Sequence, residues 1–332
     1  MTQTSLAPSG LLAATQRWSA LLRNNPRMYQ SLRPFQTEWI PLRGLRYHVR
    51  HWGSATSTEP PLVLLHGWMD VGASYQFVVD AFSEAFVQGR RIIAPDWRGF
   101  GLTQPPAGND HYQFPDYLAD LERLLEHYSP GQAVDLVGHS MGGNIAMMYA
   151  GVRPERIRRL INLEGFGMPA NTPEQAPARY AQWLNELHQY ECGTLTMKAY
   201  DSAEAVAQRL IKTNPRLPQD KADWLAQHWA QANAQGEWRI LGDAAHKIIN
   251  AQLYRVEEVL ALWRAITAPT LAVEATDNHM AHWWQGRYTL EQYHERLQAV
   301  SNCQQAVVQD AGHMLHHDQP QAVAALIEGF VS

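Results

Sequence analysis

Hydrophobic and polar positions along this chain follow two alternating periods. The first is a set of short apolar runs, typical of strands buried in a parallel sheet. These runs are residues 61–65, 91–94, 134–137 and 157–163. The second is a spacing of three or four residues between apolar side chains, which is typical of amphipathic helices. It occurs in residues 73–86, 114–128 and 144–150. This alternation predicts βαβ units and an α/β fold.

The strand pattern extends on both sides of these units. Residues 37–52 predict two strands that turn at Arg43 and Gly44. Near the other end of the chain, residues 268–273 and 305–309 again have the pattern of strands, and helices are expected at 289–300 and 320–330. The sheet is therefore expected to gain strands from both ends of the sequence.

Residues 168–263 interrupt the alternation. This segment is helical in pattern, polar and rich in tryptophan. We expect a helical lid at 168–263, inserted into a core made of 37–167 and 264–332. Residues 1–36 predict an N-terminal helical extension and not a signal peptide, because arginines interrupt the apolar positions and no basic segment precedes an apolar block.

Composition limits the kinds of partner that the chain is expected to have. Its 332 residues are 45% hydrophobic and carry a net charge of −5, with no long run of one sign. Nucleic acid and anionic membrane are therefore not expected as partners, and a small molecule is. No apolar run reaches about 18 residues, so no membrane span is expected. The two cysteines, Cys192 and Cys303, form no C-x-x-C motif, and a cytoplasmic location is the default expectation.

One motif joins an expected strand to an expected helix and carries the strongest chemical signal. Gly138, His139, Ser140, Met141 and Gly142 form a G-x-S-x-G sequence, the pattern of a nucleophile elbow. A serine on so sharp a turn adopts strained backbone angles, and the residues two positions away must lack bulk. Its hydroxyl is then exposed near the positive end of a helix. Ser140 is the candidate nucleophile.

From the elbow outward, the chain resembles the α/β-hydrolase fold family. The resemblance includes His66 and Gly67 after a strand, the Asp96-Trp-Arg-Gly-Phe-Gly101 loop, the elbow, and Asp310-Ala-Gly-His313. It covers roughly residues 37–330 and implies a mostly parallel, eight-stranded sheet flanked by helices. That family carries its nucleophile, acid and histidine in the chain order found here.

The resemblance implies a Ser-His-acid triad. His313 follows the last expected strand and is the candidate general base, because imidazole titrates near neutral pH. Two carboxylates follow strands where the family places its acid. Asp277 has the commoner position and is preferred, and Glu164 is the alternative, which resembles the arrangement in some haloalkane dehalogenases. The adjacent His316 and His317 are expected to be structural.

The resemblance also implies an oxyanion hole made by the backbone N–H groups of Met141 and Trp68. Cofactors and metals are not expected. The spacing of Asp277, His279 and His282 suggests a metal site only weakly, because no H-E-x-x-H or paired-thiolate motif accompanies it.

A serine at the elbow favours acyl transfer. It argues against the epoxide hydrolases and haloalkane dehalogenases of this fold, which form their covalent ester on a carboxylate. We expect hydrolysis of a small or medium apolar carboxylic ester through an acyl-enzyme. The alternatives are a C–C bond hydrolase, lactonase or thioesterase with the same triad, a cofactor-free oxygenase or perhydrolase, and a binding module without turnover.

Overall fold

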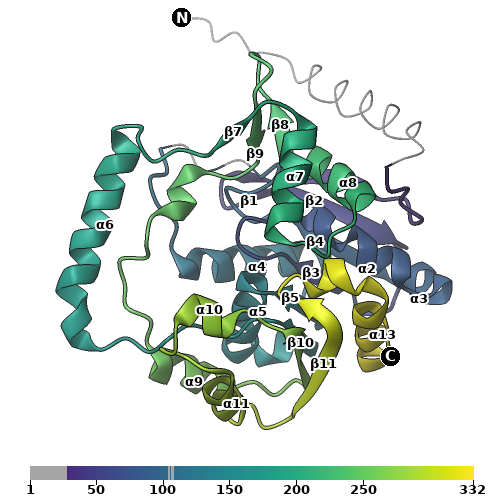
Figure 1. Ribbon diagram of the computed structural model, residues 1–332. Helices are drawn as coiled ribbons and strands as arrows, with labels where there is room; N and C mark the ends of the chain where they lie inside the picture. The colour runs from purple at the N-terminus through teal and green to yellow at the C-terminus, as the bar shows by residue number, and fades with distance from the viewer. Residues whose placement is uncertain (1–27, 104, 106–107) are drawn as a thin grey trace, which may run out of the picture.

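The computed structural model describes residues 28–103, 105 and 108–332, and these form an eight-stranded sheet covered by helices on both faces (Figure 1). The strands of this sheet are β1 (Gln36–Leu42), β2 (Leu45–Gly53), β3 (Leu62–Leu65), β4 (Arg91–Pro95), β5 (Val134–His139), β6 (Ile157–Leu163), β10 (Thr270–Asp277) and β11 (Cys303–Gly312). Their spatial order is β1-β2-β4-β3-β5-β6-β10-β11. The expected α/β class and mostly parallel, eight-stranded sheet are confirmed.

Only β2 runs against its neighbours, since it pairs antiparallel with β1 and β4 while the other pairings are parallel. The central strands β3 and β5 are buried along their whole length, as their continuous apolar runs predict. The carboxyl ends of parallel strands meet at one edge of the sheet, so the loops that follow β3, β5, β6, β10 and β11 gather there.

Two layers of helix cover the sheet. One face packs against α2 (Gln76–Ala81), α3 (Glu84–Gly89), α12 (Leu315–Asp318) and α13 (Pro320–Val331). The other face packs against α4 (Phe114–Tyr128), α5 (Met141–Val152), α9 (Val256–Arg264), α10 (Met280–Trp284) and α11 (Leu290–Leu297). These two layers enclose the two main hydrophobic clusters of the core.

The helix expected at residues 73–86 is broken in the structure. A short 3₁₀ turn at Gly72–Tyr75 leads into α2, and α3 begins after Ser83. The break has a local cause, because the Ser83 side chain accepts a hydrogen bond from the N–H of Phe86, 3.2 Å away, and so caps a new helix.

The segment between β6 and β10 is inserted into the sheet order, since these two strands pair directly with each other. It contains α6 (Ala176–Glu191), α7 (Ala203–Thr213), α8 (Gln219–Trp229) and a small antiparallel sheet of β7 (Ala199–Tyr200), β9 (Trp238–Ile240) and β8 (Ala230–Ala232). Figure 1 shows α6 set apart from the main sheet, and none of its residues is buried. The sequence predicted a helical segment, but the structure also contains a small sheet there.

The end of this segment also differs from the expected boundary. Residues 168–263 were assigned to the insertion, but α9 lies against α5 in the sheet-covering layer. Val259 and Trp263 are buried in the same hydrophobic cluster as α5 residues Ile145 and Met147. The expected N-terminal helix falls almost entirely within residues 1–27, outside the described residues. Among the described residues, no helix has the length and apolar character needed to span a bilayer.

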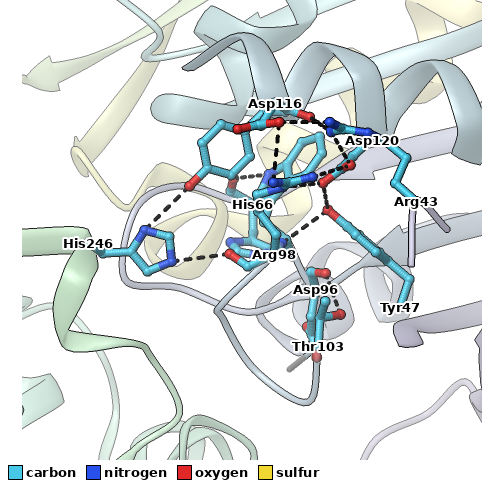
Figure 2. A network of polar contacts seen from close by, with 11 residues as sticks. Arg43, Tyr47, His66, Asp96, Arg98, Thr103, Asp116, Asp120 and His246 are labelled. Atoms are coloured by element: carbon cyan, nitrogen blue, oxygen red, sulfur yellow. Dashed lines mark hydrogen bonds and ion pairs between the residues drawn. The ribbon is translucent and has the colours of Figure 1, made fainter. Parts of the chain in front are cut away.

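A buried polar network fixes the loop that follows β4 (Figure 2). The Arg98 guanidinium donates from Nε and Nη2 to the two oxygens of Asp120, at 2.6 and 2.7 Å. The Tyr47 hydroxyl donates to Asp120, 2.8 Å away, and accepts from the N–H of Arg98 at 3.0 Å. His246, from the inserted segment, donates from Nε2 to the carbonyl of Arg98, 3.1 Å away. The network thus joins α4, β2 and the insertion around one loop.

Candidate active site

Ser140 lies between β5 and α5 in a strained conformation, with φ 52° and ψ −114°. Its N–H donates to the carbonyl of Leu163 at the end of β6, 2.8 Å away. The turn is therefore held by the neighbouring strand, and the side chain lies at the carboxyl edge of the sheet.

The two glycines of the motif are required by close contacts. A Cβ on Gly138 would lie 2.2 Å from the carbonyl oxygen of Gly142. A Cβ on Gly142 would lie 2.3 Å from the carbonyl oxygen of Leu65 at the end of β3. Both neighbours are backbone atoms. A side chain at Gly138 would push against the start of α5, and one at Gly142 would force the elbow away from β3.

His313, in the loop after β11, brings one ring nitrogen to the serine and the other to a carboxylate. Its Nε2 lies 3.0 Å from Ser140 Oγ. Its Nδ1 lies 3.1 Å from Oε2 of Glu164. The three side chains come from loops after β5, β6 and β11, three of the loops that meet at this edge.

Glu164 is held in place from both ends. Its backbone has φ 57°, and its N–H donates to the carbonyl of Val273 in β10, 2.9 Å away. Its other oxygen, Oε1, accepts from the N–H of Ala275 at 2.6 Å. The side chain is fully buried. Burial raises the pKa of Glu164, and the hydrogen bond and charge of His313 oppose that rise.

Asp277, which the sequence analysis preferred as the acid of the triad, does not contact His313. It ends β10 at the same edge, but its side chain is 57% exposed and is paired with Arg216. The expected preference is therefore corrected in favour of the alternative, Glu164. The physical reason is side-chain direction, because Glu164 turns inward on its left-handed backbone while Asp277 follows a register shift in β10 and points to solvent.

The loop after β3 lies against the elbow. A Cβ on Gly67 would lie 3.2 Å from the Cβ of Ser140. The loop is tied to the segment after β4, because His66 Nε2 accepts from the N–H of Trp97 at 2.9 Å and the Trp97 indole donates to the His66 carbonyl at 3.1 Å. Among the described residues, the backbone N–H groups of Trp68 and Met141 donate to no acceptor in the protein. Both remain available to a ligand.

Aromatic side chains border the serine. Trp283 in α10 packs edge-on against His313, with ring centroids 4.4 Å apart. Trp68 is 52% exposed, and its indole donates to the carbonyl of His246 in the inserted segment, 3.3 Å away. Trp224 of the insertion is instead buried against Phe77 of α2. Two aromatic side chains thus lie at the site, Trp283 against His313 and Trp68 on the loop that meets the elbow.

No motif in the sequence singled out His139, the residue before Ser140. It is 1% exposed, and its Nε2 donates to the carbonyl of His313, 2.7 Å away. Burial lowers the pKa of His139 well below its usual value, and the neighbouring His316 and His313 add to that effect. A neutral imidazole therefore braces the loop that carries His313.

Comparison with known families agrees with the fold. The sequence profile described as alpha/beta hydrolase fold matches residues 60–320. Among curated proteins, a serine hydrolase-like protein of Danio rerio is 26% identical over 298 residues, covering 88% of this chain and 86% of that protein. A cis-3-alkyl-4-alkyloxetan-2-one decarboxylase of Shewanella oneidensis is 26% identical over 294 residues, covering 86% of this chain and 87% of that protein.

A solved structure is similar over most of the chain. The thioesterase domain from the curacin biosynthetic pathway superposes with a TM-score of 0.75 at 25% identity, covering 89% of this chain and 99% of that domain. The similarity thus includes both the sheet and much of the inserted segment.

Proposed function

Because the chain belongs to the α/β-hydrolase fold family and is similar to a serine hydrolase-like protein, we propose that it is a serine hydrolase that cleaves a small or medium apolar carboxylic ester. The observation that carries the proposal is the contact chain from Ser140 Oγ through His313 to Glu164, with distances of 3.0 and 3.1 Å. This geometry is within the range that proton transfer to a general base requires.

In the first half-reaction, Ser140 Oγ attacks the ester carbonyl while His313 Nε2 takes its proton. The Glu164 carboxylate accepts the Nδ1–H bond, fixes the tautomer and stabilises the imidazolium that forms. The N–H groups of Met141 and Trp68 bind the developing oxyanion. The imidazolium then protonates the departing alcohol and leaves an acyl-enzyme on Ser140. Water, deprotonated by His313, releases the acid in the second half-reaction.

The apolar character of the substrate is inferred from the borders of the site. Trp68 and Trp283 flank the serine and the histidine, and neither brings a charge. The bond from the Trp68 indole to the carbonyl of His246 joins this border to the inserted segment. We therefore assign that segment the role of a lid that shapes the acyl pocket.

A lactone is the second candidate substrate, and one observation favours it. The Shewanella oneidensis relative, similar over 86% of this chain, is named for an oxetan-2-one, which is a four-membered lactone. Since a lactone is a cyclic ester, attack by Ser140 would open its ring by the same steps. A lactone belongs in the first substrate panel.

The test is turnover of p-nitrophenyl esters from acetate to decanoate and of simple lactones, by wild type, Ser140→Ala and His313→Ala. We expect kcat/KM to fall at least about 10³-fold in both variants, because nucleophile and base act as a unit. Ser301→Ala and His188→Gln, at exposed positions, are the matched controls and should keep wild-type rates.

Two results would overturn the proposal. If His313→Ala abolished activity while Ser140→Ala retained it, the histidine would act without an acyl-enzyme, as in a cofactor-free oxygenase or perhydrolase. If folded wild type turned over no ester or lactone, acyl hydrolysis of this class would be wrong.

A further inference from the structure

Three buried side chains below the elbow come together from distant parts of the chain. Asp70 follows the loop after β3, His139 ends β5, and His316 lies in α12. They are 5%, 1% and 0% exposed. Each places one possible metal-ligating atom within 4.8 Å of those of the other two.

Several of the polar atoms in this cluster have no partner among the described residues. Oδ2 of Asp70, Nδ1 of His139 and both ring nitrogens of His316 are buried without a hydrogen bond. The other oxygen of Asp70 accepts from the Ser74 hydroxyl. Buried polar atoms are normally paired, because an unpaired one costs about 1–3 kcal/mol. Such a concentration of unused lone pairs points to a ligand.

The cluster also carries a negative charge that lacks a strong counterion. Within the described residues, no lysine or arginine pairs with Asp70, and its one ion-pair partner is His316 at 3.6 Å. A buried carboxylate is stable only when it is paired or coordinates a cation.

His139 has the second contact that metal-binding histidines usually make. Its Nε2 donates to the carbonyl of His313, which in a neutral ring leaves the lone pair on Nδ1. Histidine ligands of metals commonly donate their other ring N–H to a backbone carbonyl or carboxylate, which fixes tautomer and orientation.

From these contacts, we propose that Asp70, His139 and His316 form a binding site for one divalent transition-metal ion of the Zn²⁺ type. Two imidazoles and a carboxylate suit Zn²⁺ or Co²⁺, whereas Mg²⁺ and Ca²⁺ prefer oxygen ligands alone. Ligand atoms in a tetrahedral zinc site lie about 3.4 Å apart. Oδ2 of Asp70 and Nε2 of His316 are already 3.6 Å apart. The ligand atom of His139 lies within 4.8 Å of both, so a small shift of His139 would bring all three ligand atoms to this spacing.

The position of the site suggests what the ion does. His139 directly precedes Ser140, and His316 lies three residues after His313. A bound ion would therefore join the two loops that carry the nucleophile and the base, and it would also hold the loop of Asp70 near Gly67. The role is structural, since none of the three side chains hydrogen-bonds to Ser140 Oγ or to a ring nitrogen of His313. It does not depend on which bond Ser140 attacks.

The test begins with metal content. Because the ligands are buried, the full chain is expressed in medium supplemented with Zn²⁺ or Co²⁺ and then dialysed against a weak chelator. Inductively coupled plasma mass spectrometry is expected to find about one ion per chain. Asp70→Asn and His316→Gln should each retain less than about a tenth of that amount.

Matched controls separate this site from other histidines. His317→Gln removes a buried neighbour that is outside the ligand group, and His279→Gln removes a histidine close to His313. Both should keep one ion per chain. Loss of the ion in His279→Gln, with retention in Asp70→Asn, would place the metal at His279 and its neighbours Asp277 and His282. That result would overturn the proposal.

X-ray absorption on the zinc-loaded wild type provides a measurement that does not depend on the folding of any variant. Two imidazoles and one carboxylate at about 2.0–2.2 Å are expected. A sulfur ligand, fewer than two imidazoles, or a wild type that holds less than about a tenth of an ion per chain would overturn the proposal.

Discussion

At the residue scale, the direction of a side chain decides which carboxylate assists His313. Glu164 and Asp277 both follow strands that end at the same edge, and a pattern of strands and spacings does not distinguish them. The structure does, because the left-handed backbone of Glu164 turns its side chain inward to His313. Asp277 is instead paired with Arg216 in solvent.

Two isosteric variants test that assignment. Glu164→Gln should lower kcat by about 10²–10⁴-fold, because the amide no longer stabilises the imidazolium or fixes its tautomer. Asp277→Asn should remain within a few-fold of wild type. Steady-state kinetics on one ester compares the two, and a larger loss in Asp277→Asn would reverse the assignment.

Gly142 tests the steric basis of the elbow. Gly142→Ala should destabilise the fold by several kcal/mol, on the order of 3 kcal/mol, because its Cβ meets the backbone of β3. Gly329→Ala is the matched control, since no atom lies within 4 Å of its added Cβ and it is within helix α13. It should be neutral or slightly stabilising. Urea denaturation measures both, and equal midpoints would contradict the steric account.

Sequence motifs singled out Ser140 and His313 because they describe backbone needs, such as the missing Cβ at Gly138 and Gly142. The structure places the two side chains 3.0 Å apart, and their catalytic roles stay a prediction. The sequence alone could not predict that Asp70, His139 and His316 lie together. These residues come from a loop, the end of β5 and α12. These segments meet only after the sheet has formed, and no spacing in the chain records that contact.

At the element scale, most strands lie where the apolar runs predict them, because buried parallel strands need continuous apolar sequence. The predictions of secondary structure that were wrong concern short segments. Ser83 begins a new helix inside the segment expected to be one helix, and the short strands β7, β8 and β9 leave too little periodicity to be seen within a polar insertion.

The polar network of Figure 2 joins α4 to the loop after β4, and its centre is Asp120. Asp120→Ala leaves the buried Arg98 guanidinium with only the partly exposed carboxylate of Asp116, 3.4 Å away, which should cost about 3–5 kcal/mol of the free energy of unfolding. Asp116→Ala is the matched control on the same helix, and its side chain is 32% exposed. It should cost below about 1 kcal/mol. If chemical denaturation gave similar values for the two, α4 would not depend on this network.

At the scale of the whole molecule, buried histidines set the response of stability to acid. Burial lowers the pKa of His228 and His317 well below the usual 6.5, and lowers that of His246 to about 3. Below about pH 6.5 the unfolded chain binds protons that the folded one does not, so stability is lost as the pH falls. From pH 7.5 to 5.5, each contributes a loss on the order of 1 kcal/mol.

Urea denaturation at pH 7.5 and 5.5 measures that loss. We expect the free energy of unfolding to be lower at pH 5.5 by roughly a few kcal/mol for the three histidines together. The triple replacement of these histidines by glutamine should reduce the difference, provided that it folds. A free energy of unfolding that is equal or higher at pH 5.5 would contradict the account.

The central claim is that Ser140 is a nucleophile activated by His313, and the most direct measurement is intact mass spectrometry after treatment with a fluorophosphonate. We predict one adduct per chain, mapped by peptide sequencing to Ser140 and absent in Ser140→Ala. The adduct should form much more slowly in His313→Ala, since the base is missing. An adduct on another residue, or none on folded wild type, would contradict the claim.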